Sequence, residues 1–537
     1  MIRIRYIAFA AMLSALPAAR GQSVAVPLKH DVYEFLKKME ASHILRGYRD
    51  IIKPISRLHA AKLLLAVDTA AARLTPVDLR RLNFLKIEFG HELGLLDVSW
   101  SEVPRRWHPL MFPIRGGYMN VDLNLGYSVM RSQGDHVNKQ TNGFKTYGYA
   151  FDRFGFALSF ADNRENGNAI NRNKTFTPDE GVGFLLQRAN IIEYNFANAQ
   201  FTYDASGITV ALEKIPQWWS TGRRGSLYLS TKSPAPPQFR FRAELTDWMD
   251  FTYIHADLNS LVVDSNRSYQ ANSSASTPFY RTVYRQKYLA SHAVEVSVCN
   301  WLDVSLGESV IYSDRGPQLI YLLPVMFFKS GEHYNLDTDN TQFFFSVDVN
   351  PLEHVNVYGS LVIDEFSSYD VFNEERARNQ VGWTVGTQVY DVPIPDMEWL
   401  LEYTLINPWV YSHKYPAARF TNSGYDMGHW IGQNADNLFS ELVYRPHRAV
   451  RLSAWYEAVR KGGGADVALQ YQLPSLPFLY GPVRTEHSIG IAAVYQPVRD
   501  VFLDVRARTF RTANEATPAL EHGEKPEITV GLRYGLW

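Results

Sequence analysis

The connections between predicted strands alternate in length, and this limits the possible folds more than any other feature of the sequence. From Arg115 onward apolar and polar residues alternate with a period of two, as in 119–129 and 501–508, which predicts strands with one apolar and one polar face. Short turns are expected at Asp152-Arg153, Asp204-Ala205-Ser206, Thr246-Asp247-Trp248, Asn300, Pro351-Leu352, Asp391–Asp396, Pro446-His447 and Pro497-Val498. Long polar connections are expected at about 131–143, 163–187, 216–236, 259–285, 314–340, 365–378, 407–435, 461–484 and 512–525. Nine long loops and eight short turns predict about eighteen strands, with both ends on the same side.

This arrangement is typical of a membrane barrel, because in lipid every backbone polar group must be paired and a closed sheet does so without edges. The alternative, a large soluble all-β protein, gives no reason for alternating loop lengths. We therefore predict a mainly β fold: a transmembrane antiparallel β-barrel of about 18 strands over residues 113–537. A barrel of this size has a wet interior. Charged residues expected to be solvated or paired there are Asp122, Asp348, Asp364, Asp504, Arg506 and Arg508.

The last stretch of the chain has the same periodicity. Apolar residues at 528, 530, 532, 534 and 536 alternate with small or polar ones, and the sequence ends at Trp537. An amphipathic strand with an aromatic residue at its end resembles the closing strand of bacterial outer-membrane barrels. The other interpretation is a terminal strand of a soluble sheet.

Residues 23–112 have a helical period instead. Val32, Phe35, Leu36 and Met39 would lie on one side of a helix, with Lys37, Lys38 and Glu40 exposed on the other. Ser56 is a plausible N-cap for a second helix, and Thr75-Pro76 begins a third. We expect three short helices to form a small N-terminal periplasmic α-helical bundle.

A run within this region is similar to the S-layer-homology module, which grips cell-wall polymers. Its residues are Gly47, Tyr48, Asp50, Pro54, Arg57, Ala60, Ala61 and Leu64. Two interpretations are open: these residues contact a cell-wall polymer, or they simply build the bundle.

The extreme N-terminus predicts secretion. Arg3 and Arg5 precede a short apolar run, which ends in small residues near Gly21, so residues 1–22 are predicted to be a signal peptide. No later run is long enough for a transmembrane helix; the longest candidate, Leu319–Phe328, contains Pro324. A net charge of −1 gives no indication of nucleic-acid binding, and the single Cys299 excludes an intrachain disulfide and a cysteine metal site.

Catalytic motifs are absent from the sequence. It has no H-E-x-x-H, G-x-S-x-G or phosphate-binding glycine loop. Asp364 and Glu365 are adjacent, but neighbours on a strand point to opposite faces and cannot act as an acid–base pair without a bend. We expect no enzymatic activity, cofactor or metal.

The long loops carry aromatic residues beside arginine and amide groups. A flat aromatic ring packs on the C–H face of a sugar, while Arg, Asn and Gln hydrogen-bond hydroxyl or carboxylate groups. The alternative is an aromatic girdle at the membrane interface. The candidate glycan-binding residues are Trp218, Trp219, Arg223, Arg224, Trp409, Tyr411, His429, Trp430 and Asn434.

Together, these segments resemble the Wzi-type outer-membrane proteins of capsule assembly. The resemblance is carried by Trp219–Ser230, Leu306–Phe328, Leu361–Phe366 and Glu402–Asn437, and by Gly47-Tyr48-Arg49-Asp50 near the start. It implies an eighteen-stranded barrel in the outer membrane, with its helical bundle in the periplasm, and a lectin-like role in holding capsular or exopolysaccharide at the cell surface. Other expected partners are outer-membrane lipid and the barrel assembly machinery. The alternatives are a diffusion or polysaccharide export channel and, less favoured, an outer-membrane hydrolase.

Overall fold

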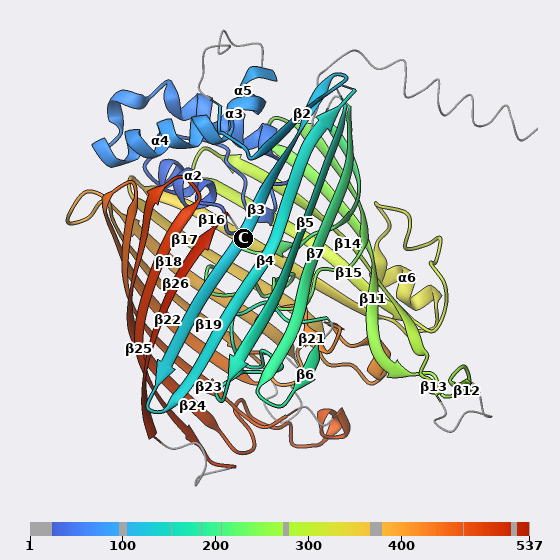
Figure 1. Cartoon of the computed structure of the whole chain (residues 1–537). Coiled ribbons are helices and arrows are strands. Elements are labelled where there is room, and N and C mark those ends of the chain that lie inside the picture. Colours follow the sequence, from blue (N-terminus) through green and yellow to red (C-terminus); the bar gives the residue numbers. More distant parts are fainter. Residues whose placement is uncertain are drawn as a thin grey trace, which may run out of the picture.

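Eighteen antiparallel strands close into a barrel in the computed structural model of the protein (Figure 1). The structure describes residues 24–95, 105–151, 153–183, 185–205, 207–271, 279–365, 379–464, 467–516 and 523–535. The barrel strands are β3 (Gly117–Ser132), β4 (Asp135–Ala150), β5 (Phe154–Gly167), β7 (Ile191–Ala205), β8 (Ile208–Lys214), β10 (Gln238–Thr246), β11 (Met249–Val263), β14 (Tyr284–Cys299), β15 (Leu302–Ser313), β16 (Asn340–Leu352), β17 (Val355–Glu365), β18 (Gln380–Tyr390), β19 (Met397–Ile406), β22 (Ala435–His447), β23 (Val450–Lys461), β24 (Arg484–Val498), β25 (Val501–Asn514) and β26 (Gly523–Tyr534). The predicted fold class and strand number are confirmed.

The closing pair is β26 with β3. Tyr534 pairs with Leu125 and Ile528 with Arg131, so the last strand does seal the barrel. The short strand β2 (Leu110–Ile114) pairs with the first residues of β3. The predicted signal peptide and the terminal residues 536–537 lie outside the described residues.

The two faces of the strands differ as the periodicity predicted. On β3, Leu123 and Leu125 are 46% and 42% exposed on the outside, whereas Asp122 is 1% exposed on the inside. Asp122 pairs with His108 at 2.9 Å. The large apolar residues are therefore on the outer surface of the barrel and do not form a dry two-layer core.

Short connections join the strands close to all eight predicted positions, although Pro351-Leu352, Pro446-His447 and Pro497-Val498 end their strands and the turn follows them. Residues 152 and 206, in two of the predicted turns, lie outside the described residues, and one predicted long loop is absent. β3 and β4 join through Gln133 and Gly134, whose φ angles of 35° and 92° form a tight turn. The predicted loop 131–143 is wrong because the first residues of β4, such as Asn138 and Lys139, are polar on both faces and lack the apolar–polar alternation by which strands were recognised. Residues 366–378 and 517–522, in two other predicted loops, are not described.

Helices occupy the end of the barrel at which the short turns lie (Figure 1). They are α2 (Val32–Ala41), α3 (Arg57–Asp68), α4 (Pro76–Glu88) and α5 (Gly90–Leu95). Both predicted caps are present: Ser56 accepts from the backbone N–H of His59, and Thr75 accepts from that of Asp78. Apolar side chains of all four helices form one core, and none of the described helices is long and apolar enough to cross a membrane.

The charged side of α2 is buried, which corrects a prediction. Lys37, Lys38 and Glu40 are 2%, 1% and 4% exposed. α2 lies against the barrel, and this side meets acidic residues of the wall strands and turns. The sequence showed that the side was charged, but it could not show that carboxylates of β16 and of the β18–β19 turn would cover it.

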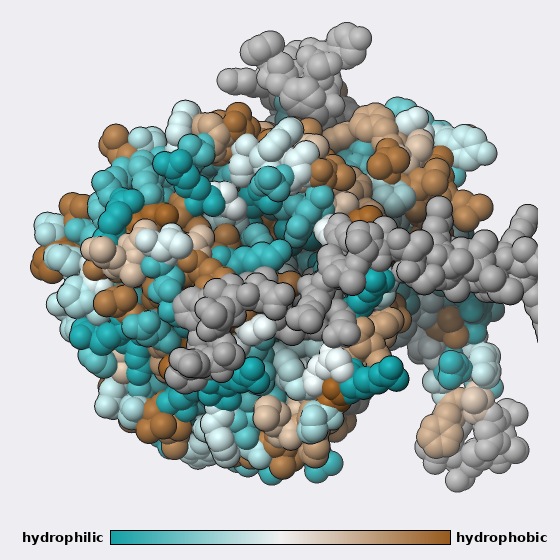
Figure 2. All heavy atoms as spheres, turned by 90° about the horizontal axis from the view of Figure 1, so that it is seen from above, coloured by the Kyte–Doolittle hydropathy of each residue, from teal (hydrophilic) through white to brown (hydrophobic). Residues whose placement is uncertain are grey.

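Contacts between the helical region and the turns fix its position on the barrel. Arg49 donates to the backbone oxygen of Asp247 at 2.6 Å, and Arg73 pairs with Glu353 at 2.9 Å. Seen from this end, hydrophilic residues cover much of the middle (Figure 2). Of the S-layer-like run, seven residues are buried and Gly47 is half-buried, which places them within the bundle or against the barrel.

Candidate functional site

A long loop folds back into the lumen and forms a plug. Within residues 215–237, the short strand β9 (Trp218–Trp219) pairs with β1 (Ile52–Lys53) of the N-terminal segment. The backbone N–H of Ser220 also donates to the oxygen of Ile51 at 3.1 Å. A loop from one end of the barrel and the helical region from the other therefore meet inside it.

The plug has an apolar core shared with the barrel wall. Trp219 is 1% exposed and packs with Leu227, Tyr228 and Leu229 of the same loop. Tyr228 stacks on the ring of the wall residue Phe344 at a centroid distance of 3.9 Å. Burial of this many aromatic and aliphatic side chains holds the plug as firmly as an ordinary protein core.

Polar contacts bind the tip of the plug to the wall. The backbone N–H groups of Arg223 and Arg224 donate to the two oxygens of Glu402 at 2.6 and 3.0 Å. The Arg224 guanidinium makes two hydrogen bonds of 2.6 Å to Glu457. Such bidentate pairs fix both distance and orientation.

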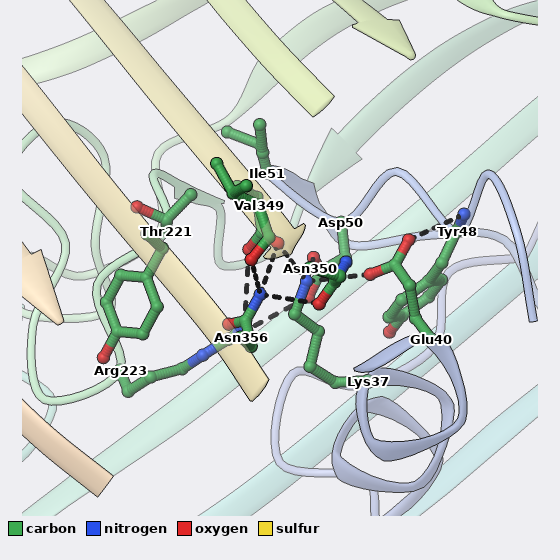
Figure 3. Close-up of polar contacts among 12 residues, drawn as sticks. Lys37, Glu40, Tyr48, Asp50, Ile51, Thr221, Arg223, Val349, Asn350 and Asn356 are labelled. Atoms are coloured by element: carbon green, nitrogen blue, oxygen red, sulfur yellow. Dashed lines mark hydrogen bonds and ion pairs between the residues drawn. The ribbon is translucent and has the colours of Figure 1, made fainter. Parts of the chain in front are cut away.

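Arg223 belongs to a charged network that joins the plug, α2 and β16. Lys37 Nζ lies 2.6 Å from Asp348, 2.8 Å from Glu40 and 3.6 Å from Asp50. Arg223 approaches Asp50 at 3.4 Å and Asp348 at 3.9 Å. Figure 3 shows Lys37, Asp50 and Arg223 of this network beside Asn350 of β16. Burial raises the pKa of the Glu40 carboxyl to about 7.

A second loop, residues 407–434, packs over the plug. Tyr411 donates its hydroxyl hydrogen to the backbone oxygen of Leu227 at 2.5 Å. His429 is fully buried against Gly225, where a Cβ would lie 2.3 Å from the His429 ring. Burial lowers the pKa of His429 to about 3, so this ring is neutral.

The structure brings most of the nine candidate residues together, but mainly as parts of this packing. Trp219, Trp409, Tyr411, His429 and Asn434 are buried. The Asn434 side chain, for example, accepts from Leu479 N and donates to the oxygens of Gly463 and Tyr480. The half-buried members are Trp218, Arg223, Arg224 and Trp430. Their glycan-binding role stays a prediction.

A cavity of about 530 Å³ lies among the plug, the wall of β18, β19 and β22–β25, and the helical region, from which Leu28, Lys29 and Tyr33 line it. It is therefore in the half of the barrel nearer the short turns, and we call it the basic cavity. Trp218, Arg223 and Arg224 line it from the plug. Its other basic residues are Lys29, Lys37, Lys53, Arg451 and Arg506, its acidic residues Glu34, Glu398 and Glu441, and its other aromatic residues Tyr33, Tyr390, Phe439 and Trp455. Most of these cations are paired with carboxylates, as Lys53 is with Asp50, Arg224 with Glu457 and Arg451 with Glu441. The lining is therefore charged throughout, and it favours a polar guest.

Several of these residues were not predicted as site residues. Arg451 and Trp455 lie on β23 with Ser453, on the opposite face from the exposed Leu452 and Tyr456. The alternation along this strand places them in the lumen, and this could have been predicted from the sequence. The presence of a cavity between these residues and the plug could not.

A second, longer cavity of about 750 Å³ follows the inner wall of β3, β4, β5, β7 and β26. It extends from Val137, near the loop end of β4, to Arg57 and Arg106 at the helical end. Arg106 pairs there with Asp500 at 2.7 Å and Glu88 at 3.2 Å. The helical region thus lines one end of the cavity with paired charges.

Three aspartates of the helical end lie close enough to hold a cation: Asp78, Asp391 and Asp396. The ammonium of Lys38 already occupies the space between them, at 2.6, 2.8 and 3.3 Å. This group is therefore an internal ion-pair cluster.

The closed barrel, the plug in its lumen and the helical region at one end together define the class of this protein: a plugged barrel of the outer-membrane type. No family model and no curated protein matches the sequence. Among solved structures, the chain is similar to Wzi of Escherichia coli, described as an outer-membrane protein involved in group 1 capsule assembly and a carbohydrate-binding β-barrel. The TM-score is 0.58 at 13% identity, covering 96% of this chain and 100% of that one. The chain thus has a Wzi-like fold.

Barrels from Pseudomonas aeruginosa are also similar, at lower scores. OprD aligns with a TM-score of 0.42 at 10% identity, covering 78% of this chain and 94% of its own. OccK7 aligns with a TM-score of 0.41 at 9% identity, covering 78% and 98%.

Proposed function

We propose that this protein is a non-enzymatic, lectin-like barrel of the outer membrane that attaches capsular or exopolysaccharide at the cell surface. In this proposal the apolar outer surface faces lipid, the helical region lies in the periplasm, and the long loops face outward. The Wzi-like fold over nearly the whole chain supports it, since Wzi is described as carbohydrate-binding. The observation that carries the proposal is the basic cavity, where aromatic rings and cations line a space beside a firmly packed plug.

The chemistry of the cavity favours an acidic polysaccharide over a neutral one. Arg506 stacks on Trp455 at 4.5 Å and forms no ion pair with any described residue. Its charge is therefore available to a guest carboxylate. Trp218 is half-buried and can contact the apolar face of a sugar ring.

Two variants test this site, and neither removes an ion pair between described residues, although Trp218 also donates a hydrogen bond to the backbone oxygen of Gly222 at 3.1 Å. Trp218→Ala and Arg506→Gln should each weaken binding of acidic capsular fragments by about tenfold, or ~1.4 kcal/mol. The control is Trp248→Ala, which removes an exposed tryptophan from a short turn outside the cavity. Binding to the purified protein is measured by calorimetry. Unchanged affinity in both variants, or equal binding of neutral fragments, would contradict the assignment.

The alternative function, a diffusion or export channel, has one observation in its favour. The longer cavity follows the inner faces of β3, β4, β5, β7 and β26 from the loop end to the helical end, and polar residues such as Asn163 and Glu165 line it beside apolar ones. A solute could follow this path if the ion pairs around Arg106 opened. Conductance measurements separate this alternative from a plugged binding protein.

A further inference from the structure

The loop between β15 and β16, residues 314–339, lies on the outside of the barrel. We call it the wall loop; it contains α6 (Phe328–Tyr334). Its buried residues Tyr321 and Phe328 pack with Ala290 and Val310. The strand neighbours of these two wall residues, Ser291 and Ile311, point inward to the plug. Because neighbours on a strand face opposite sides, the wall loop is on the outer surface, and Figure 1 shows α6 outside the barrel.

The wall loop satisfies polar groups of the outer surface. Glu308 accepts hydrogen bonds from the backbone N–H groups of Phe328 at 2.8 Å and Lys329 at 2.5 Å. Tyr253 donates to the backbone oxygen of Tyr321 at 2.7 Å, and His292 lies 3.8 Å from Glu308. Tyr253, His292 and Glu308 form one cross-strand row.

This row is far from the ends of the strands. Five residues follow Glu308 before β15 ends at Ser313, which corresponds to roughly 13 Å along the barrel axis for a strand tilted by about 40°. At that depth a bare carboxylate would face hydrocarbon, at a cost of several kcal/mol. The wall loop removes this cost by covering the row.

Between Leu319 and Phe327 every exposed side chain of the wall loop is apolar, whereas the exposed polar residues lie at its two ends, as Asp314 and Asp337 do. Leu319, Val325 and Leu336 are 82%, 84% and 85% exposed, and Leu323 and Phe327 are 56% and 58% exposed. Exposed apolar residues gathered in one loop are unusual in water, and they differ from the polar connection that the sequence predicted for 314–340. They are continuous with the outer surface of the barrel, because the Phe327 and Phe343 rings lie 6.1 Å apart.

We propose that the wall loop is embedded in the bilayer, where lipid acyl chains cover its exposed apolar residues and its backbone shields Glu308 and His292. The occupant of this surface is therefore hydrocarbon and not a protein. The inference rests on the membrane position given under the proposed function, but not on glycan binding.

A spin label on the wall loop tests the inference. Cys299→Ser removes the only cysteine, and Val325→Cys then carries the label, with Leu323→Cys as a second site if the first variant folds poorly. In phosphatidylcholine vesicles, collisions with oxygen should exceed those with a water-soluble nickel chelate. A chelate preference overturns the inference, and so does protection from both reagents, which would mean contact with a second copy or another protein.

Two control sites separate this inference from the membrane position of the whole barrel. Leu306→Cys reports on the bare outer surface, where Leu306 is 62% exposed, and Leu473→Cys on the loop 462–483. The ratio of oxygen collisions to chelate collisions at the wall-loop label should match the ratio at Leu306 and exceed the ratio at Leu473. If Leu306 itself prefers the chelate, the proposed membrane position fails as well.

Discussion

Lys37 joins α2 to the barrel wall through Asp348 of β16, and it also pairs with the buried Glu40 and Asp50 of the helical region. Replacing it with methionine keeps most of the side-chain volume but leaves Glu40, Asp50 and Asp348 without their shared ammonium. Removal of one partner from a buried ion pair costs about 3–5 kcal/mol, and the lower end of this range applies here because Asp50 keeps Lys53 at 3.0 Å and Asp348 keeps Asn356 at 2.6 Å. We expect Lys37→Met to lower the free energy of unfolding by this amount, as measured by urea unfolding in lipid vesicles. Lys62→Met, at an exposed position of α3, is the control, and an equal effect of both would contradict the role of Lys37.

The raised pKa of Glu40 predicts a pH dependence. Burial lifts the folded-state pKa to about 7 from an unfolded value near 4.5, so between these values the folded state binds more protons than the unfolded state. The contribution of Glu40 to stability therefore falls as the pH rises from about 4.5 to 7, by up to about 3 kcal/mol. Glu40→Gln should remove this part of the slope. The measurement is the unfolding free energy of both proteins across that range, and parallel curves would count against the prediction.

Individual residues also show which parts of the site could be predicted from the sequence. Trp218, Arg223 and Arg224 were recognisable as an aromatic and basic group in a long loop. Their partners Glu402, Glu457 and Asp50 are distant in sequence, and only the folding of the loop into the lumen brings them together. Composition and spacing carry no information about that inward path, so the sequence pointed to candidate residues in both loops but not to the burial of five of the nine.

At the scale of elements, Thr75, the N-cap residue of α4, makes two hydrogen bonds with its side chain. Thr75 Oγ1 accepts from the backbone N–H of Asp78 at 3.0 Å and donates to Asp396 of the β18–β19 turn at 2.6 Å. Thr75→Ala should cost roughly 2–3 kcal/mol, compared with about 1 kcal/mol for Ser56→Ala, whose side chain only caps α3. Thr75→Ser should retain both contacts. Urea unfolding of the three variants tests this order, and equal losses at Thr75 and Ser56 would show that the contact with the turn contributes nothing.

The elements themselves were largely predictable. Period-two alternation and turn residues gave eighteen strands, while N-caps and helical spacing gave α2, α3 and α4. The error at 131–143 has a local cause, since the first residues of β4 are polar on both faces and extend beyond the apolar part of the barrel surface. The Gln133-Gly134 pair was the available signal for the tight turn.

At the scale of the molecule, two parts of the chain block the lumen. The helical region covers the end with the short turns, and the plug fills the middle, joined to it by the β1–β9 pairing. A bare eighteen-stranded barrel would leave an aqueous channel. The charged network around Lys37 and Arg223 therefore connects the helical region to the plug.

This double closure predicts that the protein does not conduct ions steadily. In planar bilayers the wild type should show no lasting single-channel steps, because the plug core is packed against the wall and the longer cavity ends among paired charges. A variant that lacks residues 24–108, with residues 217–233 replaced by a short Gly-Ser linker, should show large steps, since both closures are gone. Replacing residues 266–282 in another long loop by the same linker is the control and should stay silent. Steady conductance of the wild type would instead favour the channel alternative, with the longer cavity as its path.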